Sequence, residues 1–520
     1  MIARFSNACP AAAGPAANYF LDPVNAQKDQ PDGQAETVAF LTRLAGAPPV
    51  ETHISCVFLG SDTVWKLKKA VRLPFLDFSK IEDRRRFCER ELALNAPAAP
   101  GMYRDVVPVV RGAGGVLAIG GEGEIRDWVV RMARVPTEDF IDIRAVGKAL
   151  PPSLLDAIAD AVALYHLSLP SIPDLWPDMA AIARGNAVSG LAAGLPAAEV
   201  GIWRDAMLAG LTARTAWSAA RAKAGFVRRC HGDLHLGNLC LWQGRPVLFD
   251  ALEFDEALGT IDVAYDLAFL LMDLEHRVDR AAANRVLNRY VARTGDAGLV
   301  GGLPMFLSMR AMVRAHVEAR SGHGAPANEY LSAAMRYLTP LAPIVVAVGG
   351  LPGTGKSTLA RALAPSLGVA PGALVVRSDE IRKRQHGAAP EQRLPGSAYT
   401  PEKSVAVFDE LTHAMEVVAR HGHAAVADAT FLNLAHRGMV EDAAKRAGVP
   451  FLGLWLSAPR VELERRIAAR TGDASDATIA VLHAAIGNDP GPGTWHAIDT
   501  TDGAAALTLA EALARSHIVA

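Results

Sequence analysis

The stretch "VGGLPGTGKSTLA", residues 348–360, decides the fold of the second half of the chain. It fits the spacing GxxxxGK[ST], follows the apolar run "PIVVAV", and precedes a helical pattern. A glycine-rich turn between strand and helix gathers backbone N–H groups at the positive end of the helix, where phosphate binds. We expect Lys356 to reach the β- and γ-phosphates of a nucleotide and Ser357 to ligate Mg²⁺. The predicted nucleotide-binding residues are Gly350, Gly353, Gly355, Lys356, Ser357 and Thr358.

Outward from this stretch, strand patterns alternate with helical ones from Ile344 to about residue 500, which predicts a parallel sheet covered on both faces. The second strand runs into "RSDEIRK" and the third ends in "VADAT". Both ends lie at the carboxyl edge of the sheet, where ligands bind. We expect Asp379 to be a catalytic carboxylate, Arg382 to bind an anionic acceptor, and Asp428 to hold magnesium.

The segment "ELERRIAARTGDASDA" offers Arg465, Arg466 and Arg470 as cations of a mobile lid. Charge develops on the equatorial oxygens of a transferring phosphoryl group, and Arg470, beside a glycine-containing loop, is the preferred candidate to stabilise it.

With "GLPGTGKST", "SDEIRK" and "DATF" followed by Arg437, residues 344–500 resemble the small P-loop kinases, which include gluconate kinase, zeta-toxin-like kinases and polynucleotide kinase. The resemblance implies ATP- and Mg²⁺-dependent phosphorylation of a hydroxyl group. We place Arg437 with Arg382 among the candidate acceptor-binding residues.

A second motif, "RRCHGDLHLGNLCL" at residues 228–241, spaces Asp233 and Asn238 five residues apart, as in the catalytic loop of protein kinases. Asp250 follows a short strand about a dozen residues later. This spacing suits a base beside the acceptor hydroxyl, Asp233, and two magnesium ligands, Asn238 and Asp250.

This second motif resembles that of the aminoglycoside phosphotransferase family, and the resemblance spans roughly residues 50–320. It implies a bilobal, protein-kinase-like fold, with His231 orienting the catalytic loop. Such a fold needs a strand lysine paired with a helix glutamate, and we favour Lys66 with Glu91. The segment "CVFLGSDTVWK" departs from the kinase pattern, because it offers only Gly60 where kinases carry a glycine-rich loop.

The composition fits a folded protein of several domains: 520 residues, half of them apolar, with a formal net charge of −2. Nothing in it predicts attraction to a membrane or to nucleic acid, and five scattered cysteines favour a reduced, cytoplasmic setting. Prolines in "LTPLAP" mark a boundary. The predicted parts are a flexible tail at 1–34, a kinase-like α+β domain at 35–338 and an α/β P-loop domain at 339–520.

The sequence therefore predicts a bifunctional kinase that transfers the γ-phosphate of ATP to hydroxyl groups of a small metabolite, such as a sugar. Two alternatives stay open. In the first, the missing glycine loop marks the N-terminal domain as a regulatory pseudokinase. In the second, "SDEIRK" belongs to a nucleic-acid end kinase, although no basic, aromatic-rich stretch supports it. The motifs disclose neither the acceptor nor the oligomeric state.

Overall fold

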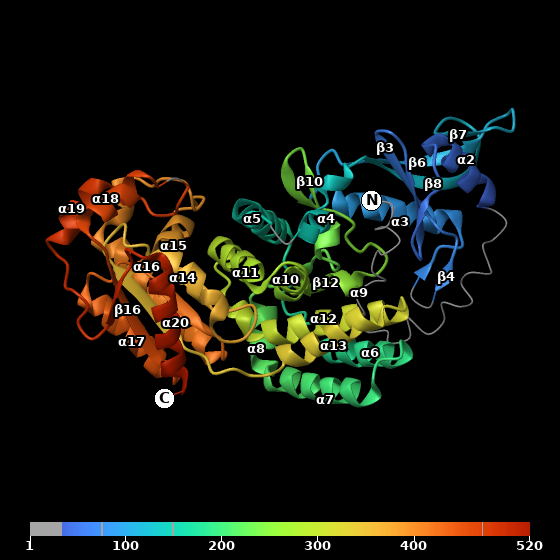
Figure 1. Cartoon of the computed structure of the whole chain (residues 1–520). Helices are drawn as coiled ribbons and strands as arrows, with labels where there is room; N and C mark the ends of the chain where they lie inside the picture. The colour runs from blue at the N-terminus through green and yellow to red at the C-terminus, as the bar shows by residue number, and fades with distance from the viewer. Residues whose placement is uncertain (1–33, 74–75, 148–149, 471, 520) are drawn as a thin grey trace. The chain divides into compact units, whose positions relative to one another are not determined.

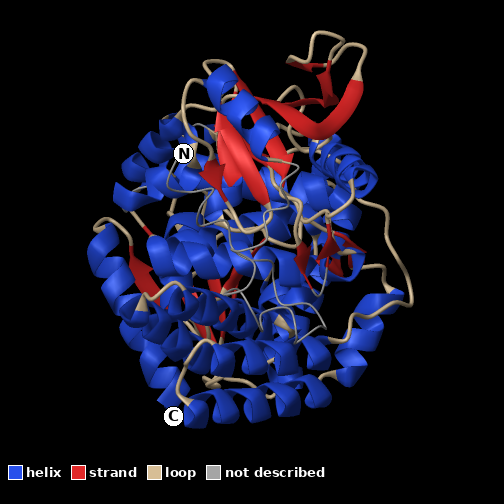
Figure 2. Cartoon of the chain, turned by 90° about the vertical axis from the view of Figure 1, so that its right-hand side faces the viewer, coloured by secondary structure: helices blue, strands red, loops and turns tan. Residues whose placement is uncertain are grey.

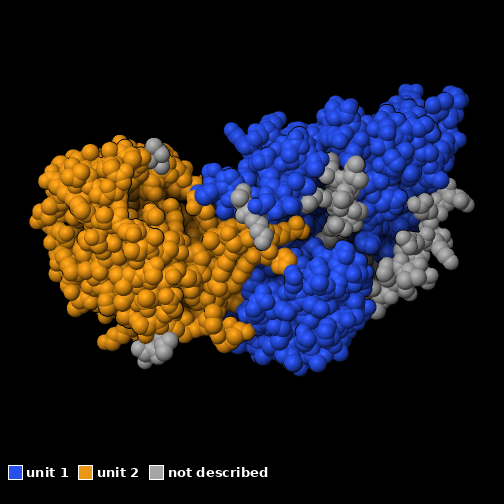
Figure 3. Space-filling view, in the orientation of Figure 1, with its two compact units in different colours: residues 1–273, 305–338 blue, residues 274–304, 339–520 orange. Residues whose placement is uncertain are grey.

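The computed structural model describes residues 34–73, 76–147, 150–470 and 472–519. They form two compact units (Figures 1 and 3). The first contains the chain up to Asp273 together with Met305–Leu338, and the second contains Leu274–Pro304 together with Thr339–Ala520. The predicted tail lies outside the described residues except for Gln34. That residue is buried, and its amide nitrogen donates hydrogen bonds to Lys68 O (2.9 Å) and Asp127 Oδ2 (2.6 Å).

The N-terminal part of the first unit is a six-stranded antiparallel sheet in the order β1-β2-β3-β8-β6-β7, whose strands are drawn in red in Figure 2. Val57, Val64 and Val130 face one core, which α3 covers with Cys88. Phe58, Leu67 and Val129 face another core, which Leu41 of α2 completes. Apolar residues on alternate faces thus bury both sides of the strands. The bounds are α2 Ala35–Ala45, β1 Val50–Glu51, β2 Ser55–Leu59, β3 Thr63–Lys68, α3 Ile81–Asn95, β6 Tyr103–Arg111, β7 Leu117–Ile119 and β8 Glu124–Ala133.

The rest of the first unit is mainly helical and holds two short antiparallel strand pairs, β9–β12 and β10–β11. The second motif of the sequence lies between β9 and β10, and Asp250 follows β11. The helices are α5 Pro152–Ser168, α6 Met179–Ala192, α7 Ala197–Ala213, α8 Thr215–Lys223, α9 Glu256–Gly259, α10 Val263–Arg277, α12 Leu303–Arg320 and α13 Gly324–Tyr337. The strands are β9 Val227–Arg229, β10 Leu239–Trp242, β11 Arg245–Leu248 and β12 Thr260–Asp262.

The second unit is built on a five-stranded parallel sheet in the order β14-β15-β13-β16-β17. Its apolar strands pack with α14 and α20 in one core. This is the predicted parallel-sheet fold. The strands are β13 Val345–Gly350, β14 Leu374–Arg377, β15 Ala425–Asp428, β16 Phe451–Ser457 and β17 His496–Asp499. The helices are α14 Lys356–Leu363, α15 Ser378–Gln385, α16 Pro401–Arg420, α17 Leu434–Ala447, α18 Arg460–Ala468, α19 Ile479–Ile486 and α20 Gly503–Val519.

Helix α11, Arg280–Thr294, precedes the predicted domain boundary in the sequence but packs in the second compact unit. Its Asn284 Nδ2 donates to Ala373 O (3.0 Å), and its Asn288 Oδ1 accepts from Val375 N (2.6 Å). Strand β14 lies at the edge of the parallel sheet, so its outer backbone groups lack a neighbouring strand. The two asparagine amides satisfy these groups and fix α11 to the sheet.

Among the described residues, none of the helices combines the length and the apolar character that crossing a membrane requires.

Candidate active sites

In the first unit, the predicted lysine–glutamate pair is formed. Lys66 Nζ, on β3, lies 2.8 Å from Glu91 Oε1, on α3, and 2.6 Å from Asp250 Oδ1. Asp250 has a positive φ of 64°, and its backbone N–H donates to the Tyr103 hydroxyl (3.1 Å). Asn95 Oδ1 accepts from the next backbone N–H, that of Ala251, at 2.8 Å. The strained turn after β11 is therefore held in place from β6 and α3.

A second buried lysine extends this cluster. Lys68 lies two residues after Lys66 on the same face of β3, and its Nζ is 2.8 Å from Glu91 Oε2 and also contacts Glu253 Oε1. Lys68 and Glu91 have no solvent-exposed surface. Each oxygen of Glu91 therefore pairs with a different lysine. The sequence reasoning did not predict the pairing of Lys68 with Glu253.

The predicted base, Asp233, lies in the loop between β9 and β10. Asn238 Nδ2 donates to the Asp233 carbonyl oxygen (2.9 Å) and to Asp233 Oδ2 (3.1 Å). His235 Nδ1 accepts from Gly237 N (3.0 Å), which leaves its Nε2 to carry the proton, 3.5 Å from Asp233 Oδ2. Asp233 Oδ1 is buried and has no hydrogen-bond partner. Asn238 thus donates to one carboxylate oxygen, His235 Nε2 lies near that same oxygen, and the other oxygen has no partner.

The loop is braced by Asp266 of α10. Its Oδ2 accepts from His231 N (3.0 Å) and contacts His166 Nε2 (3.1 Å), and its Oδ1 accepts from Gly232 N (2.9 Å). His231 Nε2 in turn contacts the carbonyl oxygen of Phe249, the residue before Asp250 (2.9 Å). Phe249 N also donates to Asn238 O (3.1 Å). These contacts bring Asp233, Asn238 and Asp250 to one place.

The electrostatics of the first site keep the key groups charged. Burial alone would raise the pKa of Asp233, but His235 and His231 outweigh it, so that this pKa is lowered. Burial alone would lower the pKa of Lys66, but Asp250 and Glu91 outweigh it and raise this pKa well above its ordinary value. At neutral pH the site therefore holds an ionised base and a protonated lysine.

No glycine-rich loop covers this site in the described structure. The turn between β1 and β2 consists of Thr52, His53 and Ile54, and the Thr52 hydroxyl closes it by accepting from Ser55 N (2.9 Å). The turn between β2 and β3 contains Gly60, where a Cβ atom would lie 2.7 Å from the Trp65 ring. Gly60 is thus required for packing of the hairpin and does not provide an open phosphate cradle.

In the second unit, the phosphate-binding loop between β13 and α14 needs its glycines. Gly350, Gly353 and Gly355 have φ values of 139°, 87° and 86°, which favour glycine. A Cβ atom at Gly350 would lie 2.5 Å from Leu456 O, and one at Gly353 would lie 2.8 Å from Leu463 O. The neighbouring backbone therefore excludes any side chain at these two positions.

The predicted lysine and metal ligands lie around this loop. Lys356 Nζ donates to Leu351 O (2.9 Å), so the lysine bonds to its own loop. Burial, helped by the positive charge of Arg470 and opposed by Asp428 and Asp379, lowers the pKa of Lys356 to about 8. The Ser357 hydroxyl donates to Asp428 Oδ2 at 2.6 Å. Thr358, on the first turn of α14, is exposed.

A residue that the sequence reasoning missed, Arg377, lies at the centre of this site. It ends β14 directly beside Asp428, its partner in the sheet register. Its Nε donates to Asp428 Oδ2 (2.9 Å) and its Nη2 to Ser357 Oγ (2.8 Å). The arginine precedes the motif "SDEIRK", and its position at the carboxyl end of a strand was the signal that could have identified it.

The two predicted residues of α15 differ in their surroundings. Burial raises the pKa of Asp379, and the neighbouring charge of Asp428 adds to this effect against the opposing charge of Arg377. Arg382 is buried, with its Nη1 donating to Ala398 O (2.8 Å) and its guanidinium carbon 4.8 Å from the centre of the Tyr399 ring. Its Nε is buried without a partner. Arg382 thus keeps one donor free but is otherwise held by the segment before α16.

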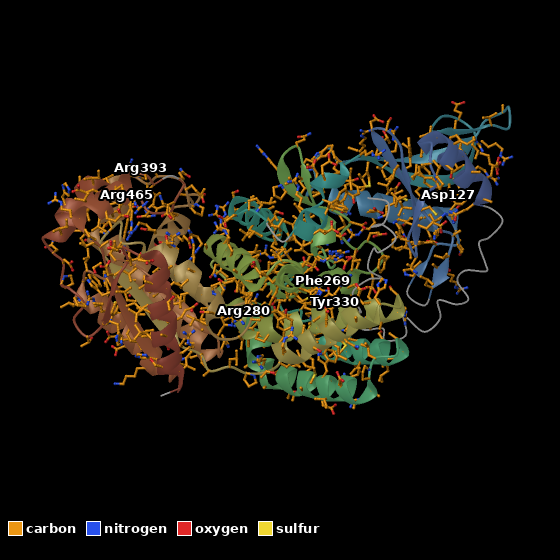
Figure 4. All side chains as sticks on the ribbon, in the orientation of Figure 1. Asp127, Phe269, Arg280, Tyr330, Arg393 and Arg465 are labelled. Carbon is orange, nitrogen blue, oxygen red and sulfur yellow. The ribbon has the colours of Figure 1, made fainter. Side chains whose placement is uncertain are left out.

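The lid arginines are distinguished by their partners. Arg465, labelled in Figure 4, and Arg466 both pair with Glu462 on α18, at 2.7 Å and 2.6 Å. Arg470 follows α18, and its Nη1 is buried without a hydrogen-bond partner. An unpaired buried guanidinium nitrogen beside Lys356 is an available donor for an anion.

Arg437 does not fit the expected acceptor role. Its Nε, Nη1 and Nη2 donate to the carbonyl oxygens of Phe431 (2.9 Å), Pro492 (2.9 Å) and Gly491 (2.7 Å). Its guanidinium carbon lies 4.1 Å from the centre of the Trp455 ring and 5.0 Å from that of the Trp495 ring. All three nitrogens thus hold main-chain segments together, and we leave Arg437 out of the acceptor-binding set.

Comparison with known proteins finds two separate family matches. Residues 72–299 match the family described as "Phosphotransferase enzyme family", and residues 345–488 match the family described as "AAA domain". These matches confirm the predicted fusion of an aminoglycoside phosphotransferase-like domain with a P-loop kinase domain. They also confirm the predicted enzyme class, a phosphotransferase.

One relative extends along most of the chain, and another covers a short part of it. An uncharacterized protein of Mycobacterium tuberculosis is 29% identical over 472 residues, which cover 86% of this chain and 91% of the relative. An adenylyl-sulfate kinase of Myxococcus xanthus is 31% identical over 110 residues, or 21% of this chain and 55% of that protein. Similar solved structures include a choline/ethanolamine kinase family protein from Mesorhizobium loti, with 15% identity, a TM-score of 0.36, and coverage of 59% of this chain and 99% of that one.

Proposed function

Because the chain joins a phosphotransferase-family domain to a P-loop kinase domain, we propose that it is a bifunctional ATP-dependent kinase. Each unit transfers the γ-phosphate of ATP to a hydroxyl group of a small metabolite, a sugar or a similar alcohol. The observation that carries this proposal is the contact of Lys66 with both Glu91 and Asp250, which supports an assembled centre in the unit that lacks a glycine loop.

The side chains of both units fit a magnesium ion. In the first unit the amide nitrogen of Asn238 donates to Asp233, so its amide oxygen is the atom that can bind a metal, and Asp250 offers a carboxylate. In the second unit Ser357 gives its proton to Asp428 and accepts from Arg377, so that the hydroxyl oxygen keeps one lone pair for a metal. Bound magnesium would neutralise charge on the phosphate oxygens. The proposed holders are Asn238 and Asp250 in one unit, and Ser357 and Asp428 in the other.

In the first unit, the ionised Asp233 accepts a hydrogen bond from the acceptor hydroxyl at Oδ1 and takes its proton during transfer. Asn238 holds the other oxygen by a hydrogen bond, with His235 3.5 Å away, and this fixes the direction of the free one. Lys66 provides positive charge for the nucleotide phosphates, and Glu91 holds it in place.

In the second unit, Lys356 leaves the carbonyl oxygen of Leu351 to bind the β- and γ-phosphates. Asp379, whose pKa is raised by burial, acts as the proton acceptor for the second hydroxyl. The free Nη1 of Arg470 donates to the transferring phosphoryl group.

The acidic residues near the first site do not favour a polycationic acceptor. Glu253 pairs with Lys68, Asp255 caps α9 by accepting from Ala257 N (2.8 Å), and Asp273 accepts from Leu236 N (3.0 Å). Glu256 pairs with Arg90 and Arg229. Each of these carboxylates already has a partner within the protein. The proposed acceptor is therefore a hydroxyl compound that does not carry several positive charges.

The alternative function is that the first unit is regulatory and that only the second unit is catalytic. The closed turns of the N-terminal sheet favour this alternative. The experiment is ATP turnover against a metabolite library, with oligonucleotides as an additional acceptor, for the wild type, Asp233→Asn and Lys356→Met. The exposed Asp205→Asn and Lys445→Met serve as matched controls.

We expect Asp233→Asn to remove one acceptor activity and Lys356→Met to remove another. If Lys356→Met abolishes every activity while Asp233→Asn abolishes none, the bifunctional proposal is wrong and the regulatory reading replaces it. Transfer confined to oligonucleotide ends would assign the second unit to nucleic acid.

A further inference from the structure

Arg377 forms ion pairs with several carboxylates in the second site, which is more than it would need to hold a single neighbour in place. Its side chain is only 3% exposed, and it bonds to Asp428 and Ser357 as described above. Its Nη1 donates to Glu380 Oε1 at 2.7 Å, and its Nη2 also lies 3.2 Å from Asp473 Oδ1. One guanidinium therefore joins three carboxylates and the hydroxyl of the phosphate-binding loop.

The contact with Ser357 uses one of the two lone pairs of the hydroxyl oxygen and places a fixed positive charge where a metal ion would bind. The serine proton points to Asp428, so the bond from Arg377 must end on the serine oxygen itself. This oxygen is the proposed metal ligand. A cation fixed on the protein thus holds both proposed ligands, Ser357 and Asp428, through its Nη2 and Nε.

The same nitrogen, Nη2, is shared with Asp473, which lies in the lid loop at residues 472–478 after α18. Asp473 also stabilises the start of this loop, because its Oδ1 accepts a hydrogen bond from Ser475 N (2.8 Å). Further along, Asp476 accepts from Lys383 Nζ (2.7 Å) and from the Tyr399 hydroxyl (2.6 Å). The lid loop is therefore attached to the sheet edge through Arg377 and to α15 through Lys383.

We propose that Arg377 is an internal cation that competes with magnesium for Ser357. When the metal binds, Nη2 of Arg377 gives up its hydrogen bond to Ser357 and bonds to Asp473 alone. Loading of the nucleotide site then strengthens the attachment of the lid loop. This inference rests on the proposed binding of metal and nucleotide by the second unit. It makes Arg377 a positioning residue, because it acts on the lid through Asp473.

A purely structural clamp between β14 and β15 predicts the opposite sign. If Arg377 only held Ser357 and Asp428 in place, its removal would weaken metal binding. If it competes, removal leaves Asp428, Glu380 and Asp473 without their shared cation, and their field attracts a divalent ion more strongly. The sign of the change in metal affinity distinguishes the two roles.

The experiment titrates Mn²⁺ into the full chain with saturating ADP and follows bound manganese by electron paramagnetic resonance. An Asp250→Asn background removes the proposed metal carboxylate of the first unit. We expect Arg377→Met to tighten Mn²⁺ binding at least about tenfold. Arg361→Met is the matched control, because Arg361 approaches Glu380 at 3.5 Å without touching Ser357 or Asp428. We expect it to change binding less than about twofold, because the Arg361 side chain is 42% exposed and its charge is screened by water.

Hydrogen exchange of the lid loop supplies the second readout. In the parent protein, Mn²⁺ with ADP should protect residues 472–478, and in Asp473→Asn this protection should no longer depend on the metal. Asp473→Asn also covers the case in which Arg377→Met does not fold. The inference is wrong if Arg377→Met binds Mn²⁺ more weakly or as tightly as the parent, or if metal-dependent protection persists in Asp473→Asn. Neither result would affect the proposed function. Absence of Mn²⁺–ADP binding in the parent overturns the proposed function of this unit as well.

Discussion

Replacing Lys68 by methionine should damage the first unit much more than replacing the lysine beside it, Lys69. Lys68 is fully buried and is shared by Glu91 and Glu253. Without it, Glu91 retains Lys66, but Glu253 keeps a buried charge with no partner of its own. A second substitution, Glu253→Met, removes that charge and should restore most of the loss.

The magnitude follows from burial. Breaking a buried ion pair by removing one partner costs about 3–5 kcal/mol, whereas replacing both partners by apolar residues of similar volume is often close to neutral. The double-mutant cycle of Lys68→Met and Glu253→Met should therefore give a coupling free energy of at least about 2 kcal/mol. The control pair is Lys69 with Glu51, which are 2.8 Å apart, with Glu51 57% exposed. Its coupling should be about 0–1 kcal/mol.

The loss in Lys68→Met should also depend on pH. Burial raises the pKa of Glu253 even in the intact cluster. A carboxyl group with a raised pKa binds its proton more tightly in the folded state, so folding is favoured as the pH falls and disfavoured as it rises above the ordinary glutamate value. Removal of Lys68 raises this pKa further. The single variant should therefore be less destabilised at pH 5 than at pH 8, and the double variant should lose this dependence.

Native-state hydrogen exchange of β3 and β8 is the appropriate assay, because unfolding of a two-unit chain is not a two-state process. Exchange reports the opening free energy of these strands directly. A coupling free energy as small as that of the control pair would refute the reasoning. So would a Lys68→Met variant whose loss is greater at pH 5 than at pH 8.

Three further outcomes are expected. Asp233→Asn should lower single-turnover transfer in the first unit about 10²–10⁴-fold while leaving ATP binding unchanged by calorimetry, and equal loss of binding would contradict its role as base. At pH 8, ADP binding should be accompanied by uptake of about half a proton, because the pKa of Lys356 is about 8 and bound phosphate favours its protonated form. Calorimetry in buffers of different ionisation enthalpy measures this uptake, which Lys356→Met should abolish. Gly350→Ala should weaken nucleotide binding at the second site, since its Cβ would lie 2.5 Å from Leu456 O, whereas Gly438→Ala, with no atom within 4 Å, should not.

The P-loop half was predictable because its determinants are local. Strand, turn, glycine spacing and helix start all lie within residues 345–360, and short-range sterics decide them. Lys66 and Glu91 could be paired from the face of a strand and the period of a helix. The pairing of Lys68 with Glu253 joins residues 185 positions apart, and no local pattern encodes such a contact.

The position of α11 shows another limit. Helical periodicity continues through residues 263–337, and only the prolines near residue 340 break it, so the sequence placed the boundary there. What assigns α11 to the second unit is the hydrogen bonding of two asparagines to an edge strand. The order of strands in a sheet determines which strand needs such a partner, and that order is a tertiary property.

In the proposed function, the two sites provide positive charge to phosphate in different ways, and this difference should govern how each tolerates substitution. The second unit uses backbone N–H groups and a helix start in addition to Lys356 and Arg470, and side-chain substitution leaves these backbone groups in place. The first unit lacks a glycine loop and uses buried lysines and carboxylates from β3, α3 and the turn after β11. Each buried charge there is neutralised only by its partners, so changing one side chain affects folding and phosphate binding together. Among the two units, the first should therefore show the stronger coupling between stability and activity across a panel of charge substitutions.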